Sequence, residues 1–464
     1  MFFQQIVRED LGCAAYLVGS TDAGTCVVVD PRVDEVDEII DITAAKGMRV
    51  TAIVETHNHA DHVAGHEELA KRTGANVYVH ASAGVSYPHH AVRDGDEIRA
   101  GEVTLRVVHT PVHRPEHIAL EVADTSRSEE PWLVLTGDSL FIGDVARPDL
   151  AVDGTEGAQE LYTSLFGKLL KLSDGVEIYP GHVAGSLCGR AMNLKTSSTI
   201  GYERRHNGAL QANTQSDFVR DINANLPHRP PNMQRIVEIN KGTEDSPSSS
   251  APGLSSEEFD EARHEALVLD VRSPGEYGSR HVPGALNIDL RGPQFGTRVG
   301  FVVPSNRVIL LVLSETGDLE YALTELAVVG YTRVRGVLTG GMESWQRDGL
   351  PVETIPQVSV AELRDEIRRG TVGVLDVRED NEWQSRHIEN AVHIPFHQLT
   401  AHVGDVPRAD TLAVVCGSGQ RSSIATSILQ AHGVSGLQNV EGGMSAWNGS
   451  GYETTFEQPV EQRA

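Results

Sequence analysis

The chain has 464 residues, which is enough for about three domains at roughly 150 residues each. Its 39% hydrophobic and 22% charged residues are ordinary for a folded protein. The 65 acidic and 39 basic side chains give a formal charge of −26, which excludes nucleic acid and anionic membranes as main partners. An anionic substrate would therefore need a local basic site.

The cysteines and the hydropathy pattern predict a cytoplasmic protein. Four cysteines in a chain of this length do not make a disulfide scaffold. Residues 1–8 lack the charged and long apolar segments of a signal peptide. The chain also has no apolar run of about 18 residues, so we expect no transmembrane helix.

Residues 1–241 are predicted to form a first domain, in which short strands alternate with a few helices. The expected strands are 2–7, 14–18, 25–29, 50–54, 76–80, 104–109, 118–122, 132–135 and 176–179, and the expected helices are 33–46, 64–72, 157–172 and most of 196–226. Residues 242–253 are small, polar and Pro-containing, which predicts a linker.

The remainder of the chain repeats itself. Val268–Arg272 recurs as Val374–Arg378 at an offset of 106, whereas Gly340–Met342 recurs as Gly442–Met444 at an offset of 102. The first copy therefore has four extra residues, which we place near 291–300. Each copy alternates buried strands with helices, so we expect two α/β domains with parallel sheets, at 254–353 and 357–455.

Residues of metal-ligand type gather at the ends of predicted strands in the first domain. Seven residues form this set: His57, His59, Asp61, His62, His113, Asp138 and His182. A rigid sheet edge can direct such side chains toward one point, so the set predicts a metal site.

The ligand types leave two kinds of metal site open. All seven residues would fill a dinuclear hydrolytic site, in which a bridging hydroxide attacks an acyl carbon. Alternatively, His57, His113 and Asp138 would form a two-His-one-carboxylate triad, which leaves positions on Fe(II) open for a substrate and O₂. The other members, His59, Asp61, His62 and His182, would then orient the ligands and bound water.

The pattern His-x-His-x-Asp-His, followed by His, Asp and His, resembles the metallo-β-lactamase superfamily. This resemblance covers about residues 1–240 and implies an αββα sandwich with metal at the sheet edge. Thr56–His62, Thr136–Asp138 and Ala146–Asp149 more closely resemble the persulfide dioxygenases of that superfamily. Their pattern implies one Fe(II) per chain, held by the triad. One departure is Val112, where the family usually has Gly. Because Val cannot adopt the unusual backbone angles open to Gly, we expect the local turn to differ.

The second copy of the repeat has a thiol at the end of a predicted strand. Cys416 opens a six-residue loop that ends at Arg421 and leads into a predicted helix, 422–431. Backbone N–H groups of such a turn favour a thiolate and later a persulfide, and Arg421 adds positive charge. The loop residues Gly417, Ser418, Gly419 and Gln420 are the predicted substrate-binding residues. Related Cys-based phosphatases use a loop one residue longer, so the shorter loop favours sulfur transfer.

Together with Asp376–Arg378, Glu382, His387 and Gly442–Met444, this loop makes the second copy resemble a rhodanese sulfurtransferase domain. In the first copy, Ser314 occupies the Cys416 position and Leu319 the Arg421 position. A serine hydroxyl is not ionised near neutral pH and cannot carry sulfane sulfur. The first copy therefore resembles an inactive rhodanese domain. Its expected role is packing, assembly or orientation of the two active domains, and the sequence does not distinguish among these.

A few other residues are candidates for substrate chemistry. Cys188 follows His182 by six residues and is expected either to receive sulfur or orient a substrate near the metal, or simply to pack. Arg147 and Arg190 are candidate partners for an anionic substrate. Cys13 and Cys26 lie in predicted strands and are expected in the core.

The whole chain resembles the multidomain persulfide dioxygenase–sulfurtransferase fusions of bacterial sulfide detoxification. The resemblance implies oxidation of a low-molecular-weight thiol persulfide, of glutathione, coenzyme A or a similar thiol, to sulfite with O₂. Cys416 would then transfer sulfane sulfur to sulfite and give thiosulfate, and the reverse transfer is also open. We further expect a homo-oligomer, a dimer or a tetramer.

Two alternatives to this function stay open. One is a glyoxalase-II-like thioester hydrolase with two Zn ions. The other is a sulfur carrier or sensor, in which the metal would be structural.

Overall fold

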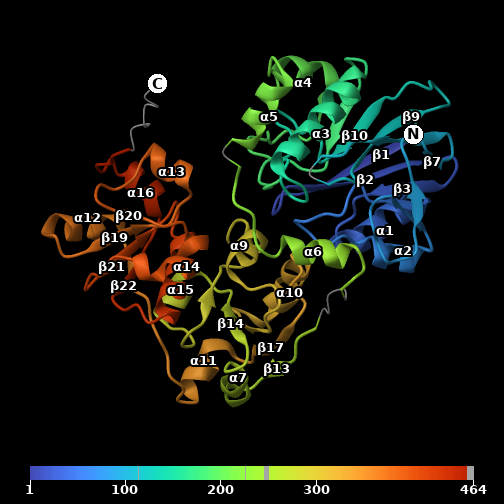
Figure 1. Ribbon diagram of the computed structural model, residues 1–464. Helices are drawn as coiled ribbons and strands as arrows, with labels where there is room; N and C mark the ends of the chain where they lie inside the picture. Colours follow the sequence, from blue (N-terminus) through green and yellow to red (C-terminus); the bar gives the residue numbers. More distant parts are fainter. Residues whose placement is uncertain (113, 225, 245–249, 457–464) are drawn as a thin grey trace. The chain divides into compact units, whose positions relative to one another are not determined.

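The computed structural model describes residues 1–112, 114–224, 226–244 and 250–456 (Figure 1). The chain divides into two compact units. The first comprises Met1–Pro247 and Leu326–Tyr331, and the second comprises Ser248–Glu325 and Thr332–Ala464. None of the helices in the described part of the chain has the length and apolar character that a membrane crossing requires.

Two six-stranded sheets form the centre of the first unit. The first sheet has the order β1 (Phe2–Arg8), β2 (Cys13–Ser20), β3 (Thr25–Val29), β4 (Arg49–Val54), β5 (Asn76–His80) and β6 (His90–Val92). The second has the order β12 (Ser198–Thr199), β11 (Glu177–Pro180), β10 (Leu133–Gly137), β9 (Ile118–Asp124), β8 (Val103–His109) and β7 (Glu97–Ala100).

Helices cover the outer faces of both sheets. The helices of this unit are α1 (Val36–Ala45), α2 (His66–Thr73), α3 (Gly154–Gly167), α4 (Ile200–His206), α5 (Gln215–Asn223) and α6 (Met233–Asn240). The alternation of strand side chains explains the layers: Val27 and Val29 of β3 face the core between the sheets, whereas Cys26 and Val28 face the core beneath α1 and α2. The predicted αββα sandwich is therefore confirmed.

Some helix and strand boundaries differ from those predicted from the sequence. The helix expected at 157–172 begins at Gly154, because the Asp153 side chain accepts a hydrogen bond from Thr155 N at 2.9 Å and caps it. The helical segment expected at 196–226 contains α4, a 3₁₀ turn and α5 as separate pieces. The short strands β6, β7 and β12 carry too few residues for a periodic signal.

The second unit contains two five-stranded parallel sheets with the same strand order. The first has the order β13 (Gly253–Leu254), β17 (Val334–Leu338), β16 (Ile309–Val312), β14 (Leu267–Asp270) and β15 (Leu286–Asn287). The second has the order β18 (Gln357–Val358), β22 (Leu437–Val440), β21 (Leu412–Val415), β19 (Gly373–Asp376) and β20 (Val392–His393). The internal repeat therefore encodes two copies of one α/β fold, as predicted.

Helices flank these sheets in each copy. The first copy has α7 (Ser256–Ala262), α8 (Pro274–Ser279), α9 (Phe295–Val302), α10 (Leu319–Val328) and α11 (Gly341–Arg347); the second has α12 (Val360–Arg369), α13 (Asp380–Ser385), α14 (Leu399–His402), α15 (Gln420–Ala431) and α16 (Gly443–Gly449). The helix α9 lies between β15 and β16, where the second copy has the shorter α14 between 3₁₀ turns. This is the stretch in which the first copy was expected to be longer.

The repeated Asp-Val-Arg motif makes the same buried ion pair in both copies. Arg272 donates to Asp270 at 2.5 Å, and Arg378 donates to Asp376 at 2.6 Å. Both carboxylates are fully buried, and a buried charge needs such a partner. The motif thus fixes the ends of β14 and β19, each of which lies next to the central strand of its sheet.

Candidate functional site

The His-rich turn begins directly after β4, and the neighbouring strand holds its first residue. Thr56 N donates to Asp30 Oδ1 at 2.7 Å, and Thr56 Oγ1 donates to Asp30 Oδ2 at 2.8 Å. Thr56 Oγ1 also lies 2.9 Å from His57 Nδ1. Asp30 has φ of 51°, a left-handed conformation that Asp tolerates better than most residues. One carboxylate therefore orders the entry to the turn.

The helix α6 holds the other side of the same turn. Asn240 Nδ2 donates to His59 O at 2.9 Å and to His62 O at 2.8 Å. Its Oδ1 accepts from Ala64 N at 2.9 Å. Because Asn240 is buried, these bonds satisfy main-chain groups that water does not reach. Asn240 therefore fixes the turn, although it was not among the site residues predicted from the sequence.

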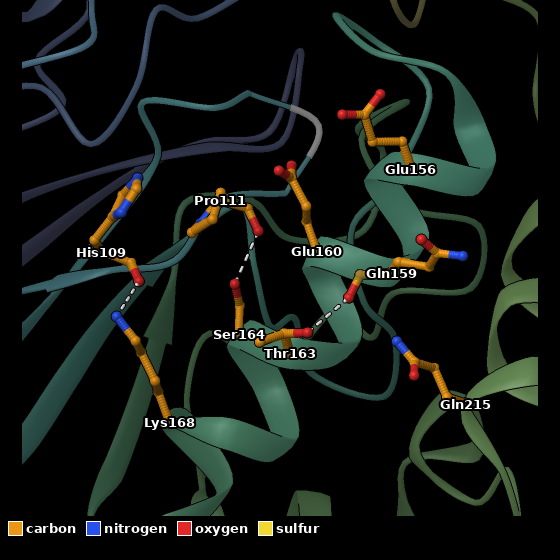
Figure 2. A pocket seen from close by; sticks show the side chains of 9 residues that line it. All are labelled: His109, Pro111, Glu156, Gln159, Glu160, Thr163, Ser164, Lys168 and Gln215. Carbon is orange, nitrogen blue, oxygen red and sulfur yellow. Dashed lines mark hydrogen bonds between the residues drawn. The ribbon is translucent and has the colours of Figure 1, made fainter.

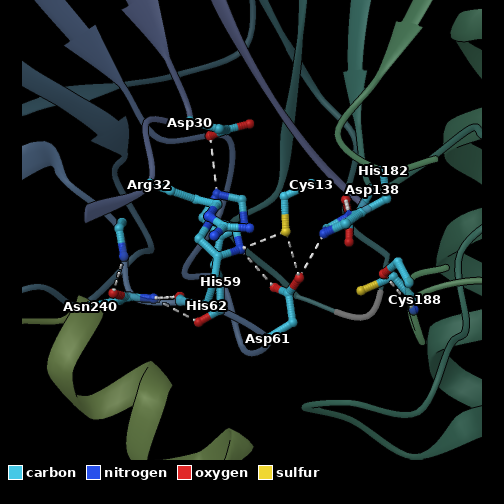
Figure 3. A network of polar contacts seen from close by, with 12 residues as sticks. Cys13, Asp30, Arg32, His59, Asp61, His62, Asp138, His182, Cys188 and Asn240 are labelled. Carbon is cyan, nitrogen blue, oxygen red and sulfur yellow. Dashed lines mark hydrogen bonds and ion pairs between the residues drawn. The ribbon is translucent and has the colours of Figure 1, made fainter. Parts of the chain in front are cut away.

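Four members of the predicted metal set form one buried polar network, which Figure 3 shows. His182 joins two carboxylates, with Nδ1 at 2.7 Å from Asp138 Oδ1 and Nε2 at 2.7 Å from Asp61 Oδ2. His62 Nδ1 lies 3.2 Å from Asp61 Oδ1. Burial would raise the pKa of Asp61, but His182 and His62 hold it well below its usual value.

His57 joins this network from the start of the turn. Its Nε2 lies 3.8 Å from Asp138 Oδ2, and both side chains are buried. The backbone N–H of Asp138 donates to His117 Nε2 at 2.8 Å, so a further imidazole fixes the residue after β10. Two of the three residues predicted to hold iron, His57 and Asp138, are thus close neighbours.

The third predicted iron ligand, His113, lies outside the described residues. The stretch before it is anchored to α3, as Figure 2 shows: Ser164 Oγ donates to Pro111 O at 2.8 Å, and Lys168 Nζ donates to His109 O at 2.7 Å. These residues line a pocket of about 410 Å³ beside α3. No described member of the metal set lines that pocket.

His59 faces a second pair of acids. Its Nε2 lies 3.2 Å from Asp30 Oδ1 and 3.4 Å from Glu55 Oε2. Burial would lower the pKa of His59, but these two carboxylates hold it well above the usual value. Its ring centroid is still 4.2 Å from that of His57 and 4.3 Å from that of His62. His59 therefore connects the turn to the end of β3.

The buried donor set fits a metal ion. His62 Nε2 is buried and has no hydrogen-bond partner among the described residues. Ligand atoms of Cys13, Asp61, His62 and His182 lie within 4.8 Å of one another, and those of Asp138, His182 and Cys188 form a second such group. Imidazole, carboxylate and thiol atoms are ligands for Zn and Fe, and buried carboxylates need compensating positive charge.

Two cysteines lie closer to this cluster than their sequence patterns indicated. Cys13 is buried as expected, but its Sγ lies 3.4 Å from Asp61 Oδ2 and 3.4 Å from His62 Nδ1. Cys188 lies beside His182 and also packs against Phe141. Cys26 lies in the apolar core beneath α1.

The two arginines selected from the sequence are already engaged within the fold. Arg147 is buried, pairs with Asp149 at 2.8 Å through Nε and 3.1 Å through Nη2, and also donates to Pro227 O at 2.8 Å. Arg190 Nη1 donates to Asp221 O at 2.7 Å. Arg147 therefore holds neighbouring segments together, and substrate binding by either arginine stays a prediction.

A different pair of arginines lines a pocket beside the His-rich turn. This pocket has a volume of about 270 Å³, and its lining includes Ala60 of the turn, Arg114 and Arg229. Arg114 Nε is buried without a hydrogen-bond partner in the described part of the chain, and burial lowers the pKa of this residue. Arg114 could not be selected from the sequence, since only its position next to His113 sets it apart.

The second unit places Cys416 in a ring of donors. Cys416 follows β21 and is fully buried. Its Sγ accepts hydrogen bonds from Gly419 N at 3.2 Å and from Ser422 Oγ at 3.4 Å. Its carbonyl accepts from Met444 N at 2.7 Å, which joins the loop to the start of α16. The loop and the start of α15 therefore both direct donors at the sulfur.

Arg421 closes the Cys416 loop through an ion pair. Its Nη1 lies 2.6 Å from Glu382 Oε2 and its Nη2 lies 2.8 Å from Glu382 Oε1. A methyl group added at Gly417 would meet Arg421 Nη2 at 3.1 Å, so the guanidinium lies against the loop. In the first copy, Ser314 Oγ instead donates to Glu276 Oε2 at 3.1 Å, and no arginine occupies position 319.

Sequence and structure comparisons agree with this architecture. The Metallo-beta-lactamase superfamily matches residues 8–182, and the Rhodanese-like domain matches residues 255–348 and 359–450.

Three proteins illustrate the likeness. The crystal structure of a metallo-beta-lactamase from Staphylococcus aureus is 28% identical and covers 72% of this chain and 98% of that chain, with a TM-score of 0.66. ETHE1 from Myxococcus xanthus is 30% identical over 52% of this chain and 99% of its own, with a TM-score of 0.46. A hydroxyacylglutathione hydrolase from Polaromonas sp. is 31% identical over 36% of this chain and 60% of its own length.

Proposed function

Because this chain is a metallo-β-lactamase-fold domain followed by two rhodanese-like domains, we propose that it oxidises a thiol persulfide and transfers sulfane sulfur. In this proposal the first domain converts the persulfide of a low-molecular-weight thiol to sulfite with O₂. Cys416 then passes sulfane sulfur to sulfite and gives thiosulfate. The role would be removal of sulfide and persulfide.

One observation carries the proposal: a buried His and Asp cluster and a thiol held by N–H and O–H donors occur on the same chain. Rhodanese-type thiols handle sulfane sulfur, so a metal site that oxidises persulfide would use the same substrate class. The pocket with Arg114 and Arg229 adds positive charge beside the His-rich turn, which suits the carboxylates or phosphates of a thiol carrier.

In the proposed oxygenase site, His57, His113 and Asp138 would hold one Fe(II). When bound, the iron would supply open coordination positions for the persulfide sulfur and O₂. The chain's own part is to fix the donors. His182 holds the Asp138 carboxylate at 2.7 Å, and Asp61 holds His182 from the other side, so the buried acid keeps one orientation.

In the proposed transfer, the Cys416 thiolate attacks the outer sulfur of a persulfide R–S–SH. The bond between the two substrate sulfurs breaks, and the thiol R–SH leaves, so that Cys416 becomes a persulfide. The sulfur of sulfite then attacks the outer sulfur of this persulfide, and thiosulfate leaves with the regeneration of the Cys416 thiolate. Gly419 N and Ser422 Oγ stabilise the thiolate at each end of the cycle.

Oxygen consumption by the iron-loaded full chain tests the oxygenase. Glutathione persulfide and coenzyme A persulfide should each be assayed, because both carriers have anionic groups that a basic pocket would attract. We expect O₂ uptake with sulfite as a product, and Asp138→Ala should lose both bound iron and uptake. A chain that holds iron but takes up no O₂ with either persulfide would exclude the proposal.

A glyoxalase-II-like hydrolase is the second candidate. The observation in its favour is that Asp61, His62 and His182 form a compact ligand group apart from His57, which suits a second metal ion. The similarity to a hydroxyacylglutathione hydrolase points the same way but covers 60% of that protein. Two zinc ions per chain together with hydrolysis of S-lactoylglutathione would establish this function instead.

A further inference from the structure

The first copy of the repeat contacts one side of the helix that follows Cys416. The helix α15 has serine hydroxyls on a buried side, and this side contacts the end of β15. Asn287 N donates to Ser427 Oγ at 3.1 Å, and Ser423 Oγ donates to the Asn287 side chain. All three residues are buried. The active copy therefore completes its polar contacts with residues of the copy that lacks the thiol.

The contact continues into the Cys416 loop itself. Gln420 Nε2 donates to Asp289 Oδ2 at 2.8 Å. A methyl group added at Gly292 would meet Gln420 Oε1 at 2.9 Å and Arg298 Nη1 at 3.3 Å. The guanidinium of Arg298, on α9, therefore lies against the same point as the side chain of the loop residue Gln420. Arg298 belongs to the stretch in which the first copy is longer than the second.

Arg298 is a buried cation with an open donor. Its residue is 7% exposed, and Nη1 has no hydrogen-bond partner in the described part of the chain. Burial lowers its pKa to about 10, whereas attraction to Cys416 raises it and repulsion from Arg421 lowers it. The two arginines differ in one respect that matters for an anion. Both terminal nitrogens of Arg421 are occupied by Glu382, whereas Nη1 of Arg298 is not occupied by a side chain.

We propose that Arg298 of the first rhodanese-like copy binds the oxyanion end of sulfite or thiosulfate at Cys416 of the second copy. This inference rests on the proposed sulfur transfer for the identity of the anion. Sulfite and thiosulfate share the same SO₃ group, which a guanidinium donor recognises through charge-assisted hydrogen bonds. The copy without a thiol would thus supply a substrate-binding residue to its neighbour.

Arg298 would assist the transfer of the outer sulfur from the Cys416 persulfide to sulfite. The lone pair of the sulfite sulfur forms a bond to the outer sulfur of the Cys416 persulfide. The bond from that outer sulfur to Cys416 Sγ breaks, and its electron pair stays on the thiolate. Arg298 holds the sulfite oxygens during the exchange, so the sulfur lone pair points toward Cys416. The step requires no oxidant and no reductant.

Equilibrium binding of thiosulfate to the full-length Cys416→Ser protein tests this inference. The serine cannot accept sulfur, so isothermal titration calorimetry measures binding without reaction. We expect Arg298→Gln, added to this background, to raise the Kd about tenfold or more, as loss of a charge-assisted hydrogen bond implies. Arg298→Lys should restore part of the affinity. The matched control is Arg335→Gln, which removes an exposed arginine from β17 of the same copy and should leave the Kd unchanged.

Two results would overturn the inference: no thiosulfate binding by the Cys416→Ser protein, or equal affinity with and without Arg298. If Arg298→Gln does not fold, Arg298→Lys decides the question, because it keeps the charge and loses the planar donor pair. A Kd for Arg298→Lys equal to that of the background would then contradict the proposal. Oxygen uptake is measured separately. A chain that lacks uptake but binds thiosulfate through Arg298 would exclude the oxygenase and support this site.

Discussion

Arg421 and Glu382 form a two-point ion pair at the edge of the Cys416 loop, with nitrogen-to-oxygen distances of 2.6 and 2.8 Å. Burial would raise the pKa of Glu382, but the hydrogen bonds and charge of Arg421 lower it below the ordinary 4.5. The pair therefore stays ionised throughout the neutral range. It contributes stability above the pKa of Glu382 in the unfolded chain, and that contribution is lost as the pH falls through the lower folded pKa.

Substitution Glu382→Gln should reduce the free energy of unfolding by about 1 kcal/mol near pH 7, since the pair is partly exposed. The difference from the parent should persist down to about pH 5 and shrink at lower pH, as Glu382 itself becomes protonated. Denaturant unfolding of the variant and the parent between pH 7 and lower pH measures this difference in the free energy of unfolding. The control is Glu276→Gln at the equivalent position of the first copy, where Ser314 rather than an arginine donates to the carboxylate. A difference that grows with acidity would contradict this account.

Gly443→Ala should disturb the Cys416 loop. Gly443 has φ of 52°, and a methyl group there would lie 2.3 Å from Cys416 O. Strain of this kind costs about 1–3 kcal/mol, and the movement that relieves it displaces the thiol. We expect a lower free energy of unfolding and slower formation of the Cys416 persulfide from thiosulfate. Mass spectrometry of the intact protein measures the persulfide. Gly449→Ala in the same helix α16 meets no neighbour within 4 Å and is the matched control. Equal behaviour of the two variants would refute the prediction.

Asp30→Asn should weaken metal binding without unfolding the first unit. Asn tolerates the left-handed conformation of Asp30, but its side chain has only one oxygen to accept the two hydrogen bonds from Thr56. Loss of such support for a ligand typically costs about 10–100-fold in metal affinity. Competition with a chelator measures the change. Asp22→Asn in the exposed turn between β2 and β3 serves as control. Unchanged affinity in Asp30→Asn would show that Asp30 does not order the turn for metal.

Cys416→Ser should change the products of persulfide oxidation. Serine cannot carry sulfane sulfur, so sulfite should accumulate in place of thiosulfate while O₂ uptake persists. The two products are separated by chromatography after a fixed amount of O₂ has been consumed. The matched control is Ser314→Ala at the equivalent position of the first copy, which should keep the product ratio of the parent. An unchanged ratio in Cys416→Ser would mean that the two sites are not coupled.

Local patterns predicted much of the fold. The alternation in β3 places Val27 and Val29 on one side and Val28 on the other, and this two-sided burial implies layers on both faces of the sheet. The repeat of Val268–Arg272 at Val374–Arg378 predicted two equal sheets, which the strand orders confirm. The predicted domain limits, oligomeric state and cytoplasmic location stay predictions.

The candidate sites were only partly accessible to sequence reasoning. His57 and Asp138 could be selected because ligand-type residues follow strands. Asp30, Asn240 and Arg298 could not, since each acts through a contact with a distant segment and has no distinctive neighbours in the sequence. Only the pairing of strands and the packing of helices bring them to the sites. The roles of the predicted ligands and of the loop residues 417–420 stay predictions.

The hydrogen bonds of Asn240 also bear on the order of events during synthesis. Asn240 follows His59 by 181 positions, and at 5–20 residues per second a ribosome needs roughly ten to forty seconds to add that length. During this interval the carbonyls of His59 and His62 lack their amide partner, so the His-rich turn is chemically complete but not yet anchored. A nascent chain would therefore acquire its final affinity for metal late, after α6 has been made and has docked.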